Sequence, residues 1–135
     1  MKNFIEKIDW NKSQGLIPVI IQDARTHTVL MLGYMNREAL QKTLRTKKVW
    51  FYSRSKKRLW MKGEISKNIL KCIEATIDCD RDTLLVKVKP SGPVCHFGSF
   101  SCFNEREEAF ERRDIFNELF EVIVSRKKNM PQILK

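Results

Sequence analysis

The sequence predicts a mostly β (α+β) fold: a barrel-like antiparallel sheet with one helix near 36–48 and an appended helix near 114–128. Short runs of β-branched and aromatic residues, separated by turn-forming residues, recur through the first three quarters of the chain and are typical of strands. Apolar residues at helical spacing occur in two further segments, which supply the α component. With 135 residues, the chain is long enough to bury a substantial core.

The N-terminal half begins with a predicted hairpin. Residues 16–23 (LIPVIIQD) and 28–35 (TVLMLGYM) are apolar and β-branched, and the turn-like ARTH separates them. Asn36 can act as the N-cap of the segment that follows, in which several apolar residues fall on one helical face. We therefore expect two paired strands and then a short amphipathic helix.

The next segments predict three more strands and a loop. Residues 49–55 (VWFYSRS) are aromatic and strand-like, and 56–63 (KKRLWMKG) form a basic connection that ends in glycine. Segments 68–80 and 83–90 have strand character, and a proline ends the second of them. The glycine-punctuated stretch 91–103 (SGPVCHFGSFSCF) predicts a loop.

The C-terminal part of the chain has a different pattern. Phe116, Leu119 and Phe120 recur at helical spacing, and a run of basic residues closes the segment, as is typical of a helix C-terminus. We therefore expect two units. Residues 1–103 carry the strands, and residues 104–135 form a charged linker and a helix.

The composition favours an anionic partner and excludes a membrane span. The chain has 26 basic and 16 acidic residues, a net charge of +10, which suits a phosphorylated metabolite or nucleic acid as well as a solvated lysine-rich surface. No window has the ~18 apolar residues that a spanning helix needs. The N-terminus carries acidic residues where a signal peptide has an apolar segment, so we expect a cytoplasmic protein.

Three aspartates alternate in the stretch IDCDRDTLLV. In an extended chain Asp78, Asp80 and Asp82 would face one side and Cys79 the other. Carboxylates suit a hard ion such as Mg²⁺, and a thiolate suits zinc. Same-face residues of a flat strand are roughly 6.5–7 Å apart, so the carboxylates can share one ion only if the backbone curls there or water bridges them. The alternative is a solvated acidic turn.

Three of the four cysteines are candidates for metal binding. Cys79, Cys95 and Cys102 lie beside polar residues in predicted turns or loops, whereas Cys72 has the pattern of a small buried hydrophobe. Without a secretion signal, spaced cysteines indicate metal or catalysis more often than disulfides. Three thiolates would leave a zinc position free for water, with His96 as a general base. The alternative for His96 is a packed histidine bonded to its loop.

The stretch 50–64 (WFYSRSKKRLWMKGE) interleaves aromatic and basic residues. Aromatic rings stack on bases while Arg and Lys contact phosphates, so this composition suits RNA or, on a smaller scale, a nucleotide pocket. A zinc-stabilised RNA-binding module that uses this face is therefore the alternative to an enzyme. A third interpretation is a strand whose aromatic residues point into the core.

Four stretches in the same order resemble phosphoribosyl-AMP cyclohydrolase of histidine biosynthesis. They lie between about residue 15 and residue 103: LIPVIIQDARTHTVLMLGYMNREAL, WFYSRSKKRLWMKGEISKN, DCDRDTLLV and GPVCHFGSFSCF. The resemblance implies hydrolytic opening of the adenine ring of 1-(5-phosphoribosyl)-AMP between N1 and C6, which gives the formimino aminoimidazole carboxamide ribonucleotide. This phosphorylated nucleotide accounts for the positive charge, and no nucleic-acid partner is expected.

The resemblance also implies cofactors and site residues. One Zn²⁺ per subunit would be shared across an intertwined homodimer, with Cys79 from one subunit and Cys95 and Cys102 from the other. His96 would move a proton at the zinc-activated water. The implied Mg²⁺ ligands are Asp78, Asp80 and Asp82, and the implied substrate-facing residues are Arg54, Ser55, Lys62, Glu64, Ser66 and Asn68.

Departures from the family pattern lie in the substrate-facing stretch and the loop. Lys67 stands where glycine is usual, and Phe97 and Phe100 stand at positions that are often polar, which would reshape the pocket mouth. The C-terminal stretch DIFNELFEVIVSRKKNMP resembles the first helix of phosphoribosyl-ATP pyrophosphohydrolase, a domain fused after the cyclohydrolase in many bacteria. We expect a truncated remnant of that domain, without pyrophosphohydrolase activity.

Overall fold

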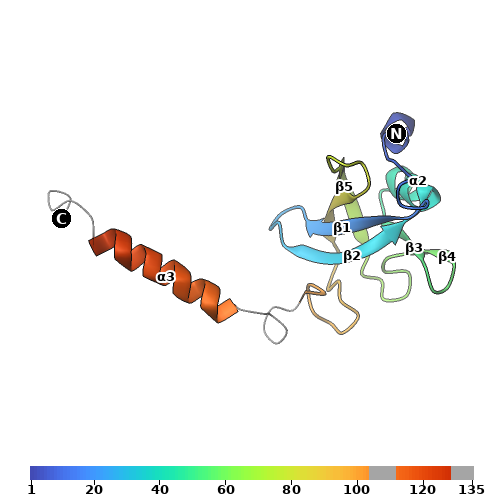
Figure 1. Ribbon diagram of the computed structural model, residues 1–135. Coiled ribbons are helices and arrows are strands. Elements are labelled where there is room, and N and C mark those ends of the chain that lie inside the picture. The colour runs from blue at the N-terminus through green and yellow to red at the C-terminus, as the bar shows by residue number, and fades with distance from the viewer. Residues whose placement is uncertain (104–111, 129–135) are drawn as a thin grey trace. The chain divides into compact units, whose positions relative to one another are not determined.

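The computed structural model describes residues 1–103 and 112–128, with the side chains of the last segment described from residue 116 onward. The chain divides into two compact units, Met1–Phe103 and Asn104–Lys135 (Figure 1). All the strands in the described part belong to the first unit, and the second contributes one helix. The predicted linker that begins at residue 104 lies outside the described residues as far as residue 111.

A four-stranded sheet in the order β2-β1-β6-β5 forms the body of the first unit. Strands β1 (Ile17–Asp23) and β2 (Val29–Met35) form an antiparallel hairpin, as predicted. Strands β5 (Leu70–Ile77) and β6 (Leu84–Pro90) form a second antiparallel pair. Strand β1 joins the two pairs by lying parallel to β6.

The sheet differs from the predicted antiparallel barrel in two respects. The β1–β6 pair is parallel, and the edge strands β2 and β5 of the described protomer do not pair with each other, so the sheet is mixed and open. Parallel strands need a long crossover, which the segment between β1 and β6 supplies. Residue periodicity predicts which segments are strands but carries no information about which strands pair. The predicted mostly-β, α+β class itself is confirmed.

A second, two-stranded sheet contains a strand where the sequence predicts a basic connection. Strand β3 (Trp50–Ser53) pairs antiparallel with β4 (Arg58–Met61), and the intervening turn includes Lys57 at a φ of +51°. Short hairpins of this kind need such left-handed backbone positions. Because β4 is rich in basic residues, its sequence lacks the apolar alternation that usually indicates a strand.

Three helices accompany the sheets in the described residues. Helix α2 (Arg37–Thr46) begins as predicted, because the backbone N–H of Ala39 donates to Oδ1 of Asn36 at 2.8 Å. Helix α3 (Arg112–Lys128) matches the predicted C-terminal helix, and the five-residue helix α1 (Lys2–Glu6) was not predicted. None of these helices has the length and apolarity needed to cross a membrane.

The core lies between the sheets and α2. Residues alternate along β1, with Ile17, Val19 and Ile21 fully buried. Phe51 of β3 is also fully buried and lies against Gly33 of β2, where an added Cβ would come within 2.5 Å of the ring. This close approach requires glycine at position 33 and fixes the two-stranded sheet against the larger one.

Candidate active site

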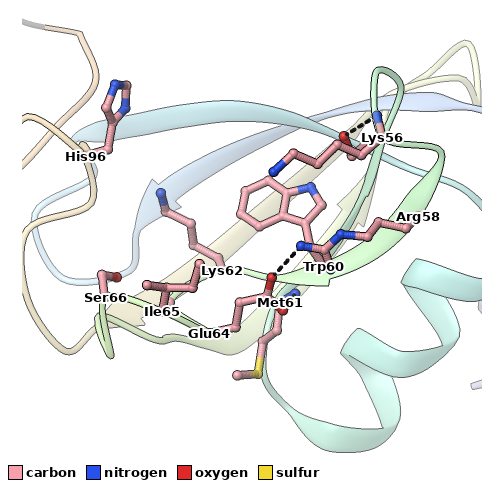
Figure 2. A pocket seen from close by; sticks show the side chains of 11 residues that line it. Lys56, Arg58, Trp60, Met61, Lys62, Glu64, Ile65, Ser66 and His96 are labelled. Carbon is pink, nitrogen blue, oxygen red and sulfur yellow. Dashed lines mark hydrogen bonds and ion pairs between the residues drawn. The ribbon is translucent and has the colours of Figure 1, made fainter.

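A cavity of about 500 Å³ lies beside β4 (Figure 2). The turn that follows β4 supplies Lys62, Glu64 and Ser66, three of the predicted substrate-facing residues. The loop 91–103 supplies His96, the predicted catalytic residue, which is exposed at the edge of the cavity. The fold thus brings together residues from two segments that lie about thirty positions apart in the chain.

Three further residues of the cavity were missed as individual sites. Lys56, Arg58 and Trp60 line it, whereas the sequence predicts only that their stretch suits nucleotide or RNA binding by its composition. Alternate residues of a strand point to the same side, so Arg58 and Trp60 share a face, and Lys62 follows in the turn after the strand. The alternation of basic and aromatic residues was the signal that could have identified them, once β4 is recognised as a strand.

Three predicted substrate-facing residues are not among those that line this cavity. Arg54 and Ser55 line a neighbouring cavity of about 610 Å³, which shares Ser53 and Trp60 with the first. The guanidinium of Arg54 stacks on the ring of Tyr34, with Cζ 4.0 Å from the centroid. The second cavity therefore also combines an aromatic ring with a cation.

Asn68 has a structural position between two turns. Its side chain lies so close to Gly92 that a Cβ on that glycine would collide with it, and its backbone carbonyl approaches Gly63 equally closely. Gly63 has a φ of +90°, which side chains rarely adopt. Asn68 therefore joins the turn after β4 to the loop that carries His96, and it lines neither cavity directly.

Glu64 is held by Arg58 at the margin of the cavity. Nη2 of Arg58 lies 3.0 Å from Oε1 of Glu64, and the backbone N–H of Met61 donates to Oε2 at 3.4 Å. The hydrogen bond from Arg58 lowers the pKa of the Glu64 carboxyl below its ordinary value, and the bond from Met61 acts in the same direction. Glu64 is therefore a carboxylate at neutral pH.

Cys95 and Cys102 lie next to each other in the loop 91–103. The Cys95 thiol is close enough to act on the titration of Cys102, and the backbone N–H of Cys102 donates to the carbonyl of Leu30 at 2.7 Å, which anchors the loop to β2. Partial burial, together with the neighbouring Cys95, raises the pKa of the Cys102 thiol, while the charge of Lys62 acts in the opposite direction. Lys62 lines the cavity, as does His96, which directly follows Cys95 in the chain, whereas neither thiol is itself among the lining residues.

Cys79 does not join this pair in the described protomer. It is exposed in the turn between β5 and β6. In the part of the chain that the structure describes, Asp78, Asp80 and Asp82 form the one group of three His, Cys, Asp or Glu side chains close enough to share an ion. Two soft donors are therefore assembled within a protomer, and a third is exposed elsewhere on its surface.

The three aspartates converge because the chain turns there. Their ligand oxygens all lie within 4.8 Å of one another. The backbone N–H groups of Asp82 and Thr83 donate to Oδ1 of Asp78 at 3.0 and 3.2 Å, and Arg81 has a φ of +63°. The backbone is therefore not extended at these residues, and it has the curl that convergence of the three carboxylates requires. Three carboxylates suit a hard divalent cation such as Mg²⁺.

The comparison with known proteins decides the family. The sequence profile described as phosphoribosyl-AMP cyclohydrolase matches residues 31–104, more than half of the chain. The chain belongs to the phosphoribosyl-AMP cyclohydrolase family. The matched segment runs from β2 through the loop 91–103 and so contains both cavities, the thiol pair and the three aspartates. The family suggested by the sequence motifs is confirmed.

Relatives within this family carry the name "Histidine biosynthesis bifunctional protein HisIE". The protein of Photobacterium profundum is 47% identical over 133 residues, which cover 96% of this chain and 64% of the relative. That of Haemophilus influenzae is 59% identical over 101 residues, 75% of this chain and 46% of the relative. That of Bacillus subtilis is 53% identical over 121 residues, which cover 87% of this chain and 58% of the relative. The chain thus spans about half to two thirds of the length of these cyclohydrolase relatives.

Proposed function

We propose that this protein hydrolyses 1-(5-phosphoribosyl)-AMP, opening the adenine ring between N1 and C6 in a step of histidine biosynthesis. One observation carries the proposal: within the segment that matches the family, His96 and Lys62 line one cavity, His96 directly follows Cys95 in the chain, and the charge of Lys62 acts on the Cys102 thiol. A general acid–base group, a cation for phosphate and soft metal donors are thus available around one space. A metal-assisted hydrolysis of a phosphorylated purine can use all three.

The reaction balances with water as the co-substrate. The water oxygen becomes the carbonyl oxygen on C6, the N1–C6 bond breaks, one water proton reaches N1, and the other is released as the ring loses its positive charge. The ribosyl group on N1 makes the ring cationic and C6 electrophilic. His96 lies at the edge of the cavity with its ring 4.0 Å from that of Phe97, and an imidazole can accept and return a proton near neutral pH. We assign the proton transfer to His96.

The donor sets fit two kinds of metal. Cys95 and Cys102 supply two soft ligands from one protomer, and we propose that Cys79 of a second copy supplies the third to a shared Zn²⁺. Zinc at such a site supplies Lewis acidity, which lowers the pKa of water. Asp78, Asp80 and Asp82 supply hard ligands that suit Mg²⁺. The exposed position of Cys79, away from the other thiols, supports a homodimer with sites between subunits.

The two units have separate assignments in this proposal. Residues 1–103 form the cyclohydrolase domain, and 104–135 correspond to a linker and the first helix of a pyrophosphohydrolase-like domain. The bifunctional name of the relatives and the 96% coverage of this chain by the Photobacterium protein support that assignment. We expect these residues alone to lack pyrophosphohydrolase activity, and we place the biosynthetic enzyme in the cytoplasm.

The RNA-binding alternative has less support. Phe51 is fully buried, and it packs against Trp60 with ring centroids 5.1 Å apart, so the aromatic residues of 50–64 do not form an open row. The remaining surface of Trp60 faces a cavity of about 500 Å³, a size typical of small-molecule sites. These features favour one nucleotide over an extended strand.

The test is turnover of 1-(5-phosphoribosyl)-AMP by the purified chain, followed by chromatography of the product. Activity that is lost after zinc chelation and in Cys102→Ala supports both the reaction and the thiolate site. Cys72→Ala is the matched control, because Cys72 is buried away from the cavity and should retain zinc and activity. A folded, zinc-loaded protein without turnover would contradict the proposed reaction.

A further inference from the structure

Trp60 occupies the centre of the cavity wall. Figure 2 shows its indole among the lining residues, with the ammonium groups of Lys56 and Lys62 beside it. Nζ of Lys62 lies 5.9 Å from the centroid of the indole ring. A flat aromatic surface and two cations therefore face the same space.

The indole is held in place from behind. The ring of Phe51 packs on it at a centroid distance of 5.1 Å and an interplanar angle of 39°. Phe51 is itself fully buried and confined by Gly33, so it can move little. Trp60 is only partly buried, and its remaining surface lines the cavity. A rigid aromatic surface loses little conformational entropy when a ligand binds.

The cations of the cavity divide into two kinds. Arg58 pairs with Glu64 at 3.0 Å. By contrast, none of the ion pairs found among the described residues involves Lys56 or Lys62. The two lysines are therefore the cations of the lining that can bind an anionic ligand without first breaking an ion pair.

We propose that Trp60 is the surface on which the purine ring of the substrate stacks, and that Lys56 and Lys62 bind its phosphate groups. This inference rests on the proposed function and names the residues that hold its substrate. Every purine presents a π face to an aromatic side chain, and ammonium groups contact phosphate oxygens. Stacking fixes the plane of the ring, so Trp60 would present C6 in a constant orientation to the groups around it.

The test of stacking measures the binding of AMP and adenosine to the zinc-loaded protein by calorimetry, without turnover. Trp60→Ala should weaken both ligands by about fivefold to 150-fold, the range that base–aromatic stacking energies imply. Trp60→Phe keeps an aromatic face and should retain most of the affinity. If circular dichroism shows that Trp60→Ala does not fold, Trp60→Leu takes its place. Leucine keeps an apolar contact with Phe51 but has no aromatic face.

The test of the lysines compares the same two ligands. Lys56→Ala and Lys62→Ala should weaken AMP at least several-fold more than adenosine, which lacks the phosphate. Lys48→Ala is the matched control, since Lys48 is exposed outside the cavity and its loss changes the net charge equally. An equal effect of all three lysine variants on AMP would overturn the assignment of the phosphate site.

The outcomes separate this inference from the proposed reaction. AMP binding that depends on Trp60, in a protein that does not turn over phosphoribosyl-AMP, would overturn the reaction and leave the stacking site standing. Unchanged AMP affinity and unchanged kcat/KM in folded Trp60→Ala would overturn the stacking site and leave the reaction standing.

Discussion

Nζ of Lys12 lies 3.1 Å from Oδ2 of Asp82, so a cation of the chain itself contacts the aspartate cluster. The hydrogen bond between them raises the pKa of Lys12 and lowers that of Asp82. The backbone holds the two segments together, because the N–H of Asp9 donates to the carbonyl of Arg81 at 2.8 Å. A divalent cation bound by the cluster would therefore compete with Lys12 for the same carboxylate.

Removing this ammonium group should strengthen divalent cation binding. Exposed ion pairs are weak because solvent screens them, so we expect Lys12→Gln to bind Mn²⁺, as a probe for Mg²⁺, at most about fivefold more tightly. Electron paramagnetic resonance of free Mn²⁺ measures this directly. Lys71→Gln is the control, because Lys71 is exposed on β5 and its loss changes the net charge equally. Equal affinities of the two variants would show that Lys12 does not compete for the site.

A zinc site shared between subunits can be tested by complementation. Cys79→Ser alone and the double variant Cys95→Ser, Cys102→Ser should each lack zinc and activity. A hybrid dimer of the two retains one complete ligand set, with Cys79 from one subunit and the thiol pair from the other. Co-expression should therefore restore one zinc per hybrid dimer, measured by atomic emission on the doubly tagged species. If each protomer formed its own site, the hybrid would have no complete set and no zinc would return.

His96 should matter for turnover and not for zinc binding. General acid–base groups contribute about 10²- to 10⁴-fold to rate, so His96→Asn should lower kcat by that factor. Zinc content and AMP affinity should remain close to those of the unmodified protein. His27→Asn is the matched control: the other histidine of the chain occupies a turn position at a φ of +63°, which asparagine tolerates. Similar loss of kcat in both variants would contradict the role of His96.

Local signals in the sequence were sufficient for the elements that depend on local chemistry. The cap at Asn36, the hairpin of β1 and β2, and the loop 91–103 all follow from residues close together in the chain, and the structure contains each of them. The parallel pairing of β1 with β6 depends on long-range packing, which periodicity does not encode. The strand β4 was missed because its polar residues line a cavity and therefore break the usual pattern of burial.

In the candidate site, too, the features that depend on local sequence could be predicted and those that depend on long-range contacts could not. Motif spacing was enough to select Cys95 and Cys102, which the structure brings together. It could not show that Asn68 packs between two turns, since that position depends on contacts with Gly63 and Gly92 from different segments. Motif spacing also could not show that Lys62 and Arg54 line different cavities, because that difference depends on the geometry of the β3–β4 hairpin.

The pair of Glu64 and Arg58 gives a pH dependence with a defined sign. The hydrogen bond from Arg58 lowers the pKa of Glu64 from its ordinary value of 4.5. Because the folded-state pKa is the lower one, the pair stabilises the folded protein above about pH 4.5 and loses that effect as the pH falls through the folded-state pKa. Both side chains are substantially exposed, so solvent screens the pair and the change in stability should be small.

Substitution of Arg58 should therefore be visible first in the titration of Glu64. In Arg58→Gln we expect the pKa of the Glu64 carboxyl to rise toward its ordinary value, measured by ¹³C NMR of the side-chain carboxyl. Lys87→Gln is the control. Lys87 pairs with Glu74 at 3.8 Å, so this substitution removes the same charge from another part of the surface. An equal rise in both variants would mean that net charge, and not the hydrogen bond at 3.0 Å, sets the pKa of Glu64.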